Sequence, residues 1–239
     1  MMSGVAIERT VPPVPPSGRR LDAGAFLFSD LAADLVRDPS RRTSSQSCTG
    51  EFMSLTTSRR LVFESAGERD LLMILDVDYR TVELTTQPER FRVHNGRRWT
   101  TYVPDVFAAS LHGERCFFQV KPGARFAADP TLKGRIDAIE EESALRGAVH
   151  RLCPREGLRV GHRLRNARWI HAAATAIDPI EARLVHSILR GFNSPCRLGE
   201  LRQGGLDTRL RNCLLGLVGH REAAIALAAP IDDELEVFW

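Results

Sequence analysis

The chain has 239 residues, a formal net charge of +3, and 43% hydrophobic and 26% charged residues. This composition is typical of a globular protein with one sizeable core or two small ones, and its mild charge permits nucleic-acid binding without proving it. No run approaches about 18 uninterrupted apolar residues, so we predict no membrane span. The five cysteines form no CxxC pair and no zinc-type cluster with histidine, which predicts a reduced, cytoplasmic protein without a structural metal.

The basic residues are almost all arginine. Of the 33 Lys and Arg residues, only Lys121 and Lys133 are lysine. Genome base composition is the simplest cause of this bias. A retained lysine can also mark a position where a guanidinium cannot replace an ammonium, because only the ammonium has a pKa that its surroundings readily shift.

The elements predicted before residue 155 are mainly strands. Residues 1–20 are rich in proline and predict a disordered lead with polyproline character. The elements expected after the lead are a helix at 22–37, a polar loop at 41–50, a strand at 61–63, a helix from 65 to about 75, strands at 82–86, 91–93 and 99–102, a hairpin of 103–110 with 115–121, a helix from 129 to 145 and a strand at 148–153. The turn between the strands at 91–93 and 99–102 is predicted at His94-Asn-Gly96.

From about residue 163 the apolar spacing becomes helical. Asp178-Pro-Ile-Glu181 supplies an N-cap, an N1 proline and a capping-box glutamate for one helix. A shorter helix is predicted from Ser194-Pro195 and a third from Asp207, followed by a hairpin at 223–239. Three helices and a hairpin in this order predict a winged helix-turn-helix, and we place a domain boundary near residue 170.

The hairpin of 103–110 with 115–121 gathers polar residues at one end. If its loop is 111–113, Asp105 lies opposite Gln119. Side chains alternate along a strand, so Lys121 would share the face of Gln119 and Asp105 while the side chains between them point into a core. A shift of one residue in the register would separate these groups.

Glu68 lies one turn into the helix predicted from residue 65, at the border of its buried stripe. An acidic group there needs a hydrogen-bonding partner or a cation. Ser65 and Glu68 also match a capping box, which would close the helix start without any metal. Two carboxylates, a carboxamide and a lysine are nonetheless the set that Mg²⁺ chemistry on phosphodiesters uses, because Mg²⁺ prefers oxygen ligands and lysine can orient or deprotonate the attacking water.

Six short motifs follow one another along the chain. They are Gly50-Glu-Phe-Met-Ser-Leu55, Phe63-Glu-Ser-Ala-Gly-Glu-Arg-Asp-Leu-Leu72, Leu75-Asp-Val-Asp78, Gln87-Pro88, Tyr102-Val-Pro-Asp-Val106 and Gln119-Val-Lys-Pro122. In this order they resemble the TnsA family, the endonuclease subunits of heteromeric (TnsA/TnsB) transposases. The resemblance covers residues 48–170 and continues more weakly beyond them.

The resemblance implies a fold and an activity. The fold is α/β (α+β): a restriction-endonuclease-like mixed sheet flanked by helices, forming a PD-(D/E)xK nuclease domain at 21–170, and a winged helix-turn-helix domain at 171–239. The activity is Mg²⁺-dependent cleavage of one strand of double-stranded DNA at transposon ends, beside a DDE transposase and an AAA+ regulator. Such a protein would be bacterial and cytoplasmic, and associated with the nucleoid when active.

Carried over residue by residue, the resemblance also implies a catalytic site. Glu68 and Asp105 match the metal-binding acids, Gln119 matches a further ligand position, and Lys121 matches the catalytic lysine. The carbonyl of Val120 would complete the protein ligands of Mg²⁺, for which Mn²⁺ could substitute.

Three residues depart from the wider pattern. Gln119 stands where an acid is common in the nuclease superfamily, which removes a negative charge and should weaken metal affinity. Thr56 and Gly67 stand where a basic residue and a bulky residue are usual. Two alternatives therefore stay open: a stand-alone nuclease of this superfamily in defence or repair, and a non-catalytic adaptor that binds DNA or a transposase.

Four arginines are candidate DNA contacts. Arg97 and Arg98 lie beside Trp99 in a predicted hairpin and could follow a DNA backbone. Arg209 and Arg211 lie early in the third carboxy-terminal helix, where a helix-turn-helix contacts DNA. Solvated charge on an edge strand or on a helix face would explain the same residues without DNA.

Overall fold

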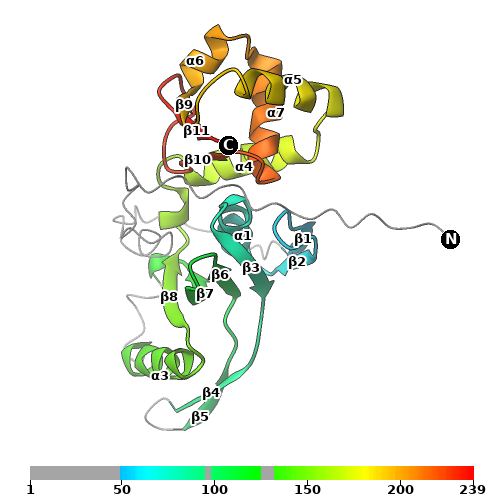
Figure 1. Cartoon of the computed structure of the whole chain (residues 1–239). Helices are drawn as coiled ribbons and strands as arrows, with labels where there is room; N and C mark the ends of the chain where they lie inside the picture. The colour runs from blue at the N-terminus through cyan, green and yellow to red at the C-terminus, as the bar shows by residue number, and fades with distance from the viewer. Residues whose placement is uncertain (1–48, 95–97, 125–131) are drawn as a thin grey trace, which may run out of the picture.

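A computed structural model of the chain describes residues 49–94, 98–124 and 132–239, apart from the side chains of 132–134. The predicted lead (1–20), the predicted helix at 22–37 and Arg97 lie outside the described residues. The described part is mixed α/β, with a mixed sheet and helices on both sides of it (Figure 1). None of the helices in these ranges is long and apolar enough to cross a membrane.

The main sheet has four strands. They are β3 (Thr81–Thr86), β6 (Val106–Ser110), β7 (Arg115–Lys121) and β8 (Val149–Pro154), in the spatial order β3-β6-β7-β8. β6 pairs antiparallel with β3 and β7, whereas β7 and β8 are parallel. β6 is shorter than the predicted 103–110, in keeping with Pro104, which has no N–H to donate to a neighbouring strand.

Two small antiparallel pairs and three helices surround this sheet. β1 (Gly50–Met53) pairs with β2 (Arg60–Phe63), and β4 (Phe91–His94) pairs with β5 (Trp99–Tyr102). The helices are α1 (Ala66–Val77), α3 (Leu132–Leu145) and α4 (Arg163–Ala174). The 3₁₀ turn η1 (Gly157–Arg159) precedes α4. The β4–β5 hairpin extends away from the main sheet in the direction opposite to α4 (Figure 1). α1 packs on the sheet and on α4, and α3 packs on β8 and β4.

Both faces of the sheet are covered, which explains why β6 is buried along its whole length. Phe118 and Val120 belong to the apolar cluster that includes α1, as the predicted alternation requires. Phe117 points to the opposite face and packs with Phe107 and with Ile139 of α3.

The carboxy-terminal part contains three helices and a small sheet. Its elements are α5 (Pro179–Leu189), β9 (Cys196–Arg197), α6 (Leu198–Gln203), α7 (Thr208–Gly219), β10 (Ala224–Ile225) and β11 (Glu236–Phe238), with the antiparallel sheet order β10-β11-β9. Asp178 caps α5 as predicted, and Asp207, where the third helix was predicted to begin, caps α7 by accepting the Leu210 N–H. The helix predicted from Ser194-Pro195 was placed too early. Cys196 instead pairs with Val237 of β11, so strand pairing across the chain delays the helix.

Residue 170, the predicted domain boundary, lies inside α4. This helix packs against α1 on one side and against α7 on the other. The approach to α7 is close, because a Cβ at Gly219 would lie 2.7 Å from the Cβ of Ala174 and one at Gly216 would lie 2.6 Å from Ile177 Cγ1. One apolar cluster therefore runs from α1 through α4 to α7.

Candidate active site at the ends of adjacent strands

The β6–β7 hairpin has the register that the sequence predicted. Val106 pairs with Phe118, so the ladder continues to Asp105 opposite Gln119. The Asp105 backbone N–H donates to the Phe118 carbonyl at 2.9 Å. The Gln119 side chain then lies against the Asp105 carboxylate, with Nε2 3.2 Å from each carboxylate oxygen. The sequence rule of alternation thus brings two of the predicted site residues into contact.

The environment of the Asp105 carboxylate destabilises its ionised form. Burial and, to a smaller extent, the nearby carboxylate of Glu68 together raise the pKa of Asp105 to about 6. The Val120 N–H, which donates to Asp105 Oδ2 at 2.7 Å, acts in the opposite direction, as do Gln119 and the positive charge of Lys121. Glu68 and Lys121 are therefore close enough to act electrostatically on Asp105.

Glu68 forms part of the capping box that the sequence allowed, with the backbone N–H of Glu64 bonded in place of that of Ser65. Its backbone N–H donates to Ser65 Oγ at 3.2 Å, and Ser65 Oγ donates back to Glu68 Oε1 at 2.8 Å. Its other oxygen, Oε2, accepts the backbone N–H of Glu64 at 2.8 Å. The carboxylate is thus fixed in orientation at the start of α1.

Gly67 allows the amino-terminal end of α1 to lie close to β7. A Cβ at Gly67 would lie 2.8 Å from Val120 Cγ1 and 3.3 Å from Arg155 Cγ. A bulkier residue would push α1 away from the strand that carries Gln119 and Lys121. The departure noted at this position therefore brings Glu68 nearer to the strand ends.

Two residues at this site were not assigned from the sequence. Gln87 adopts a left-handed backbone (φ 46°) and donates its N–H to the Asp105 carbonyl at 3.1 Å. Its side-chain Nε2 donates to Glu64 Oε1 at 2.7 Å, so Glu64 is a further carboxylate in the same neighbourhood. A left-handed backbone in a residue other than glycine is unfavourable and often occurs at functional sites. The Gln87-Pro88 motif was the available signal, but it did not show the contact.

Lys121 ends β7 beside another buried pair. The Lys121 carbonyl accepts the backbone N–H of Arg155 at 2.9 Å. Tyr102 Oη lies 2.8 Å from His150 Nε2, and both side chains are buried. Burial, with a smaller contribution from Lys121, lowers the pKa of His150 to about 4, so this imidazole is neutral at pH 7.

The donor set restricts the metal that the site could hold. Across the described ranges, no group of three or more His, Cys, Asp and Glu side chains could hold a metal ion. Two carboxylates and a carboxamide suit Mg²⁺, which binds through one or two carboxylates and keeps water and substrate phosphate as its other ligands. The same set lacks the imidazole and thiolate groups that zinc sites use.

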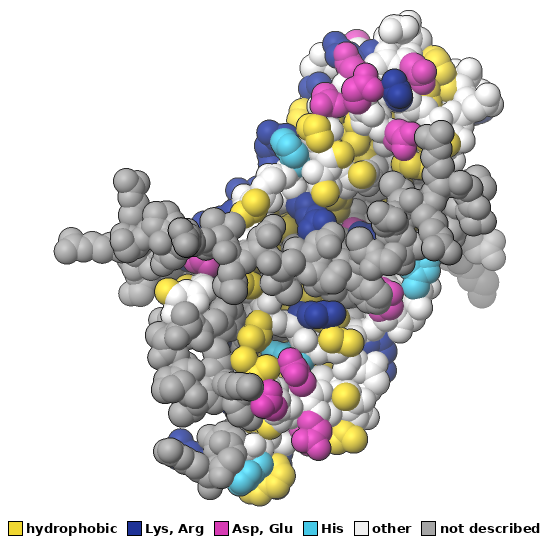
Figure 2. Space-filling view, turned by 90° about the vertical axis from the view of Figure 1, so that its left-hand side faces the viewer, with side chains coloured by type: hydrophobic (Ala, Val, Ile, Leu, Met, Phe, Trp, Pro, Cys, Tyr) yellow, Lys and Arg dark blue, Asp and Glu magenta, His cyan; other side chains and the backbone are white. Residues whose placement is uncertain are grey.

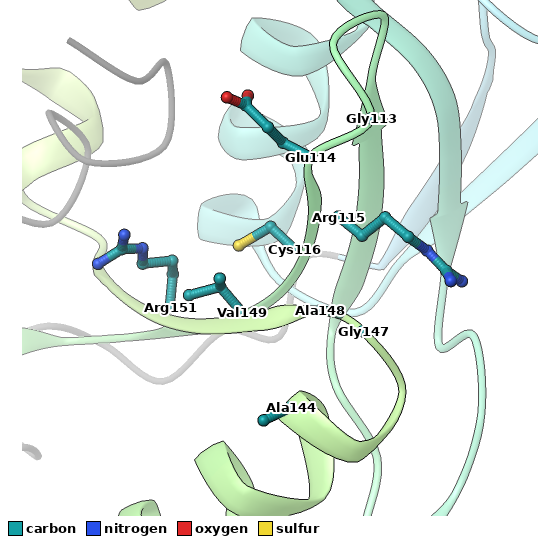
Figure 3. Close-up of a pocket in the computed structure, with 9 residues that line it drawn as sticks. All are labelled: Gly113, Glu114, Arg115, Cys116, Ala144, Gly147, Ala148, Val149 and Arg151. Atoms are coloured by element: carbon teal, nitrogen blue, oxygen red, sulfur yellow. The ribbon is translucent and has the colours of Figure 1, made fainter. Parts of the chain in front are cut away.

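A pocket of about 270 Å³ lies elsewhere, at the opposite end of β7. It is lined by Gly113, Glu114, Arg115, Cys116, Ala144, Gly147, Ala148, Val149 and Arg151. Figure 3 shows Glu114 and Arg151 pointing to one side and Arg115 to the other. Arg115 and Lys121 are six residues apart on one strand, which corresponds to about 20 Å. This pocket is therefore separate from the candidate site.

Three of the four arginines predicted to contact DNA belong to the described residues: Arg98, Arg209 and Arg211. Arg98 is exposed in the β4–β5 hairpin next to Trp99, whose side chain is also exposed. Arg209 forms an ion pair with Glu181, and the Arg211 guanidinium stacks over the ring of Trp169 at 5.0 Å. The structure gives both carboxy-terminal arginines partners within the chain.

Other acids of the quoted motifs stabilise the fold. Asp76 is buried and accepts Ser54 Oγ at 2.5 Å and the N–H groups of Leu55 and Thr56 at 2.9 and 3.0 Å. Burial acts to raise the pKa of Asp76, but hydrogen bonds from His171, Ser54 and the backbone lower it overall. Asp76 therefore holds the turn after β1 against α1.

No protein-family model matches the chain, and no curated protein is significantly similar to it.

Proposed function

We propose that the chain is a Mg²⁺-dependent DNA endonuclease of the TnsA type, which cuts one strand at transposon ends beside a DDE transposase and an AAA+ regulator. The observation that carries the proposal is the meeting of Asp105, Gln119 and Lys121 at adjacent strand ends, with Glu68 within electrostatic reach. Burial and the neighbouring carboxylate of Glu68 raise the pKa of Asp105, and a bound cation would relieve the repulsion between the two carboxylates.

The fold is compatible with this proposal. A mixed sheet with α1 on one face and α3 on the other is what a restriction-endonuclease-like PD-(D/E)xK domain requires. The element order α5-β9-α6-α7-β10-β11, with β11 central in the small sheet, is the order expected of a winged helix-turn-helix.

Each residue would have a distinct role. Asp105 and Glu68 would supply carboxylate oxygens to Mg²⁺, with the Val120 carbonyl as a further ligand. Gln119 donates its amide nitrogen to Asp105, so its amide oxygen is the atom that a cation would use. When bound, Mg²⁺ would polarise a phosphoryl oxygen and lower the pKa of the attacking water. Lys121 would orient that water for in-line attack, giving a 3′-hydroxyl and a 5′-phosphate.

One observation favours a second candidate, the non-catalytic adaptor. Both carboxylate oxygens of Glu68 already accept hydrogen bonds, from Ser65 and from the Glu64 N–H. In the adaptor, Glu68 would serve only as a helix cap, and the chain would bind DNA or a transposase without cleaving. Titration calorimetry separates the two candidates. The nuclease binds Mg²⁺ or Mn²⁺ in a manner that Asp105→Ala abolishes, and the adaptor shows no such binding.

The activity itself is tested with the full chain, a DDE transposase as the proposed partner, transposon-end DNA and Mg²⁺. We expect wild-type protein to nick the DNA at the transposon end and Lys121→Ala to leave it intact. Equal nicking by the two proteins would contradict the proposal. Nicking by the chain alone, without the transposase, would favour the stand-alone nuclease.

A further inference from the structure

A second charged cluster lies on the side of α1 that faces α4. The side chain of Asp70 has no exposed surface, and three guanidinium groups converge on it. Nη2 of Arg69, of Arg159 and of Arg168 lie 3.2, 2.8 and 2.7 Å from its carboxylate oxygens. Three guanidinium groups against one carboxylate leave two positive charges uncompensated within the cluster.

The excess charge faces solvent, whereas the carboxylate does not. The side chains of Arg69, Arg159 and Arg168 are 33%, 42% and 46% exposed. A guanidinium has five N–H donors, so contact with Asp70 leaves donors on each arginine for another acceptor. Because the buried carboxylate fixes their orientation, these side chains would lose little conformational freedom on binding an anion.

The cluster continues to the candidate active site through Arg155. The Arg155 N–H is bonded to the carbonyl of Lys121, and its Cγ packs over Gly67, the residue before Glu68. Arg155 and Arg159 are separated by a single turn of chain that leads into η1. We call Arg69, Arg155, Arg159 and Arg168 together the arginine band.

The chain around the band is strongly basic. Residues 155–168 contain five arginines and one acid, Glu156. Glu156 Oε2 accepts the N–H of Gly123 at 2.9 Å, so this acid has a partner within the chain. A few separate Lys and Arg side chains are visible between the upper and lower parts of the molecule in Figure 2. Charge and donor geometry both suit a polyanion, because the guanidinium fork matches phosphate oxygens.

We propose that the arginine band binds the sugar-phosphate backbone of duplex DNA next to the candidate active site, and that this contact positions the strand to be cut. The inference rests on the proposed function, since it takes DNA to be the substrate of that site. Contacts to phosphate fix the register of a protein on DNA without reading sequence. The band would therefore act on all sequences alike.

The test is fluorescence anisotropy of the full chain with a labelled duplex in EDTA, where no Mg²⁺-dependent cleavage takes place. Each phosphate contact makes the negative slope of log affinity against log salt concentration steeper by about 0.9. At 0.1 M salt, relative to 1 M, this corresponds to roughly eightfold in affinity. We expect the double variant Arg159→Gln with Arg168→Gln to have a slope shallower by about 1.8 and an affinity lower by roughly sixtyfold. The pair Arg159→Lys with Arg168→Lys keeps the charge and should keep most of the slope.

Two further variants make the result interpretable. Arg115→Gln makes the same charge change at the opposite end of β7 and should leave the affinity unchanged. Arg155→Gln lies outside the Asp70 cluster and should lower the slope by about 0.9, so it replaces the pair if loss of the Asp70 contacts prevents folding. Circular dichroism melting establishes that each variant is folded.

Wild-type affinity and slope in the folded glutamine pair would overturn the inference. It would equally be overturned if the pair lost binding to the proposed DDE transposase partner but kept its affinity for DNA, since the band would then contact an acidic protein surface. The two proposals fail separately. Absence of Lys121-dependent nicking contradicts the nuclease and leaves DNA binding by the band intact, whereas unchanged DNA binding contradicts the band and leaves nicking intact.

Discussion

Asp70 and Asp105 are both acids held within the fold, but their surroundings shift their pKa values in opposite directions. Burial acts to raise the pKa of Asp70, yet Arg168 and Arg159 lower it overall. Burial and Glu68 raise the pKa of Asp105 to about 6, against the opposing effects of Val120, Gln119 and Lys121. A carboxylate surrounded by guanidinium groups has its charge compensated and can hold helices together. A carboxylate beside another carboxylate retains a need for a cation, which is the property expected of a metal ligand.

The largest expected effect concerns Lys121, the positively charged side chain near Asp105. Lys121→Arg keeps the positive charge and should keep the fold, but an arginine cannot adjust its pKa to handle a proton. We expect the rate of nicking to fall by roughly 10²–10⁴-fold, the contribution typical of general acid–base catalysis. Lys133→Arg is the matched control and should nick like wild type. Full activity in Lys121→Arg would remove the argument that this site needs a lysine.

Asp70→Asn tests the structural side of the comparison. Removing the carboxylate leaves three guanidinium groups facing one another around a neutral amide, so we expect the free energy of unfolding to fall by roughly 3 kcal/mol. Urea unfolding followed by circular dichroism measures this loss. The folded fraction should still bind Mg²⁺, because the metal ligands are unchanged. An unaltered stability would mean that Asp70 does not hold η1 and α4 to α1.

The pH dependence of stability should separate the two acids. The folded state holds the Asp105 proton to a higher pH than the unfolded chain does, so this group lowers the free energy of unfolding as pH rises from about 4 to about 6. Asp70 has a lowered pKa and acts in the opposite sense, because its stabilisation is present above about pH 4 and is lost as pH falls through its folded pKa.

We therefore expect Asp105→Asn to be more stable than wild type at pH 7, by roughly 3 kcal/mol, with the difference vanishing below about pH 4. Urea unfolding between pH 3.5 and about pH 7 measures it. Mg²⁺ should stabilise wild type and leave the variant unchanged. A variant less stable than wild type at pH 7 would contradict the unfavourable charge at Asp105.

The smallest expected effect concerns the cap that holds Glu68. Ser65→Ala removes the side chain that caps the first turn of α1, which typically costs about 1 kcal/mol of stability. If Glu68 is also a metal ligand, its loss of orientation should weaken Mg²⁺ binding measured by calorimetry. Thr208→Ala, at the start of α7, is a control because Asp207 caps that helix. Unchanged Mg²⁺ affinity in Ser65→Ala would indicate that the cap and the metal site are independent.

The sequence predicted those features that depend on local rules. A three-residue loop and alternation along two strands were sufficient to place Asp105 opposite Gln119, and the spacing of Ser65 and Glu68 was sufficient to predict that Ser65 caps the Glu68 N–H. The N-cap at Asp178 and the helix start at Asp207 were predicted for the same reason, since an aspartate side chain bonds to N–H groups only two or three residues away.

Features that join distant parts of the chain were missed. Arg159 and Arg168 meet Asp70 across 89 and 98 residues, and no local pattern indicates such a contact. The strand at Cys196 exists because β11 lies beside it, and local helix signals at Ser194-Pro195 gave no sign of that pairing. The density of arginines at 155–168 was visible in the sequence, but its placement beside Lys121 depends on the parallel pairing of β7 with β8.

The position of α4 between α1 and α7 has a thermodynamic consequence. Ile170 and Ala174 belong to the buried core, and Gly219 of α7 lies against both of them. Because the two ends of the described fold share this helix, we expect heat to unfold them in one cooperative transition, with equal calorimetric and van't Hoff enthalpies. A chain cut at residue 170 would divide the helix itself, so each fragment would expose apolar surface that the intact protein buries.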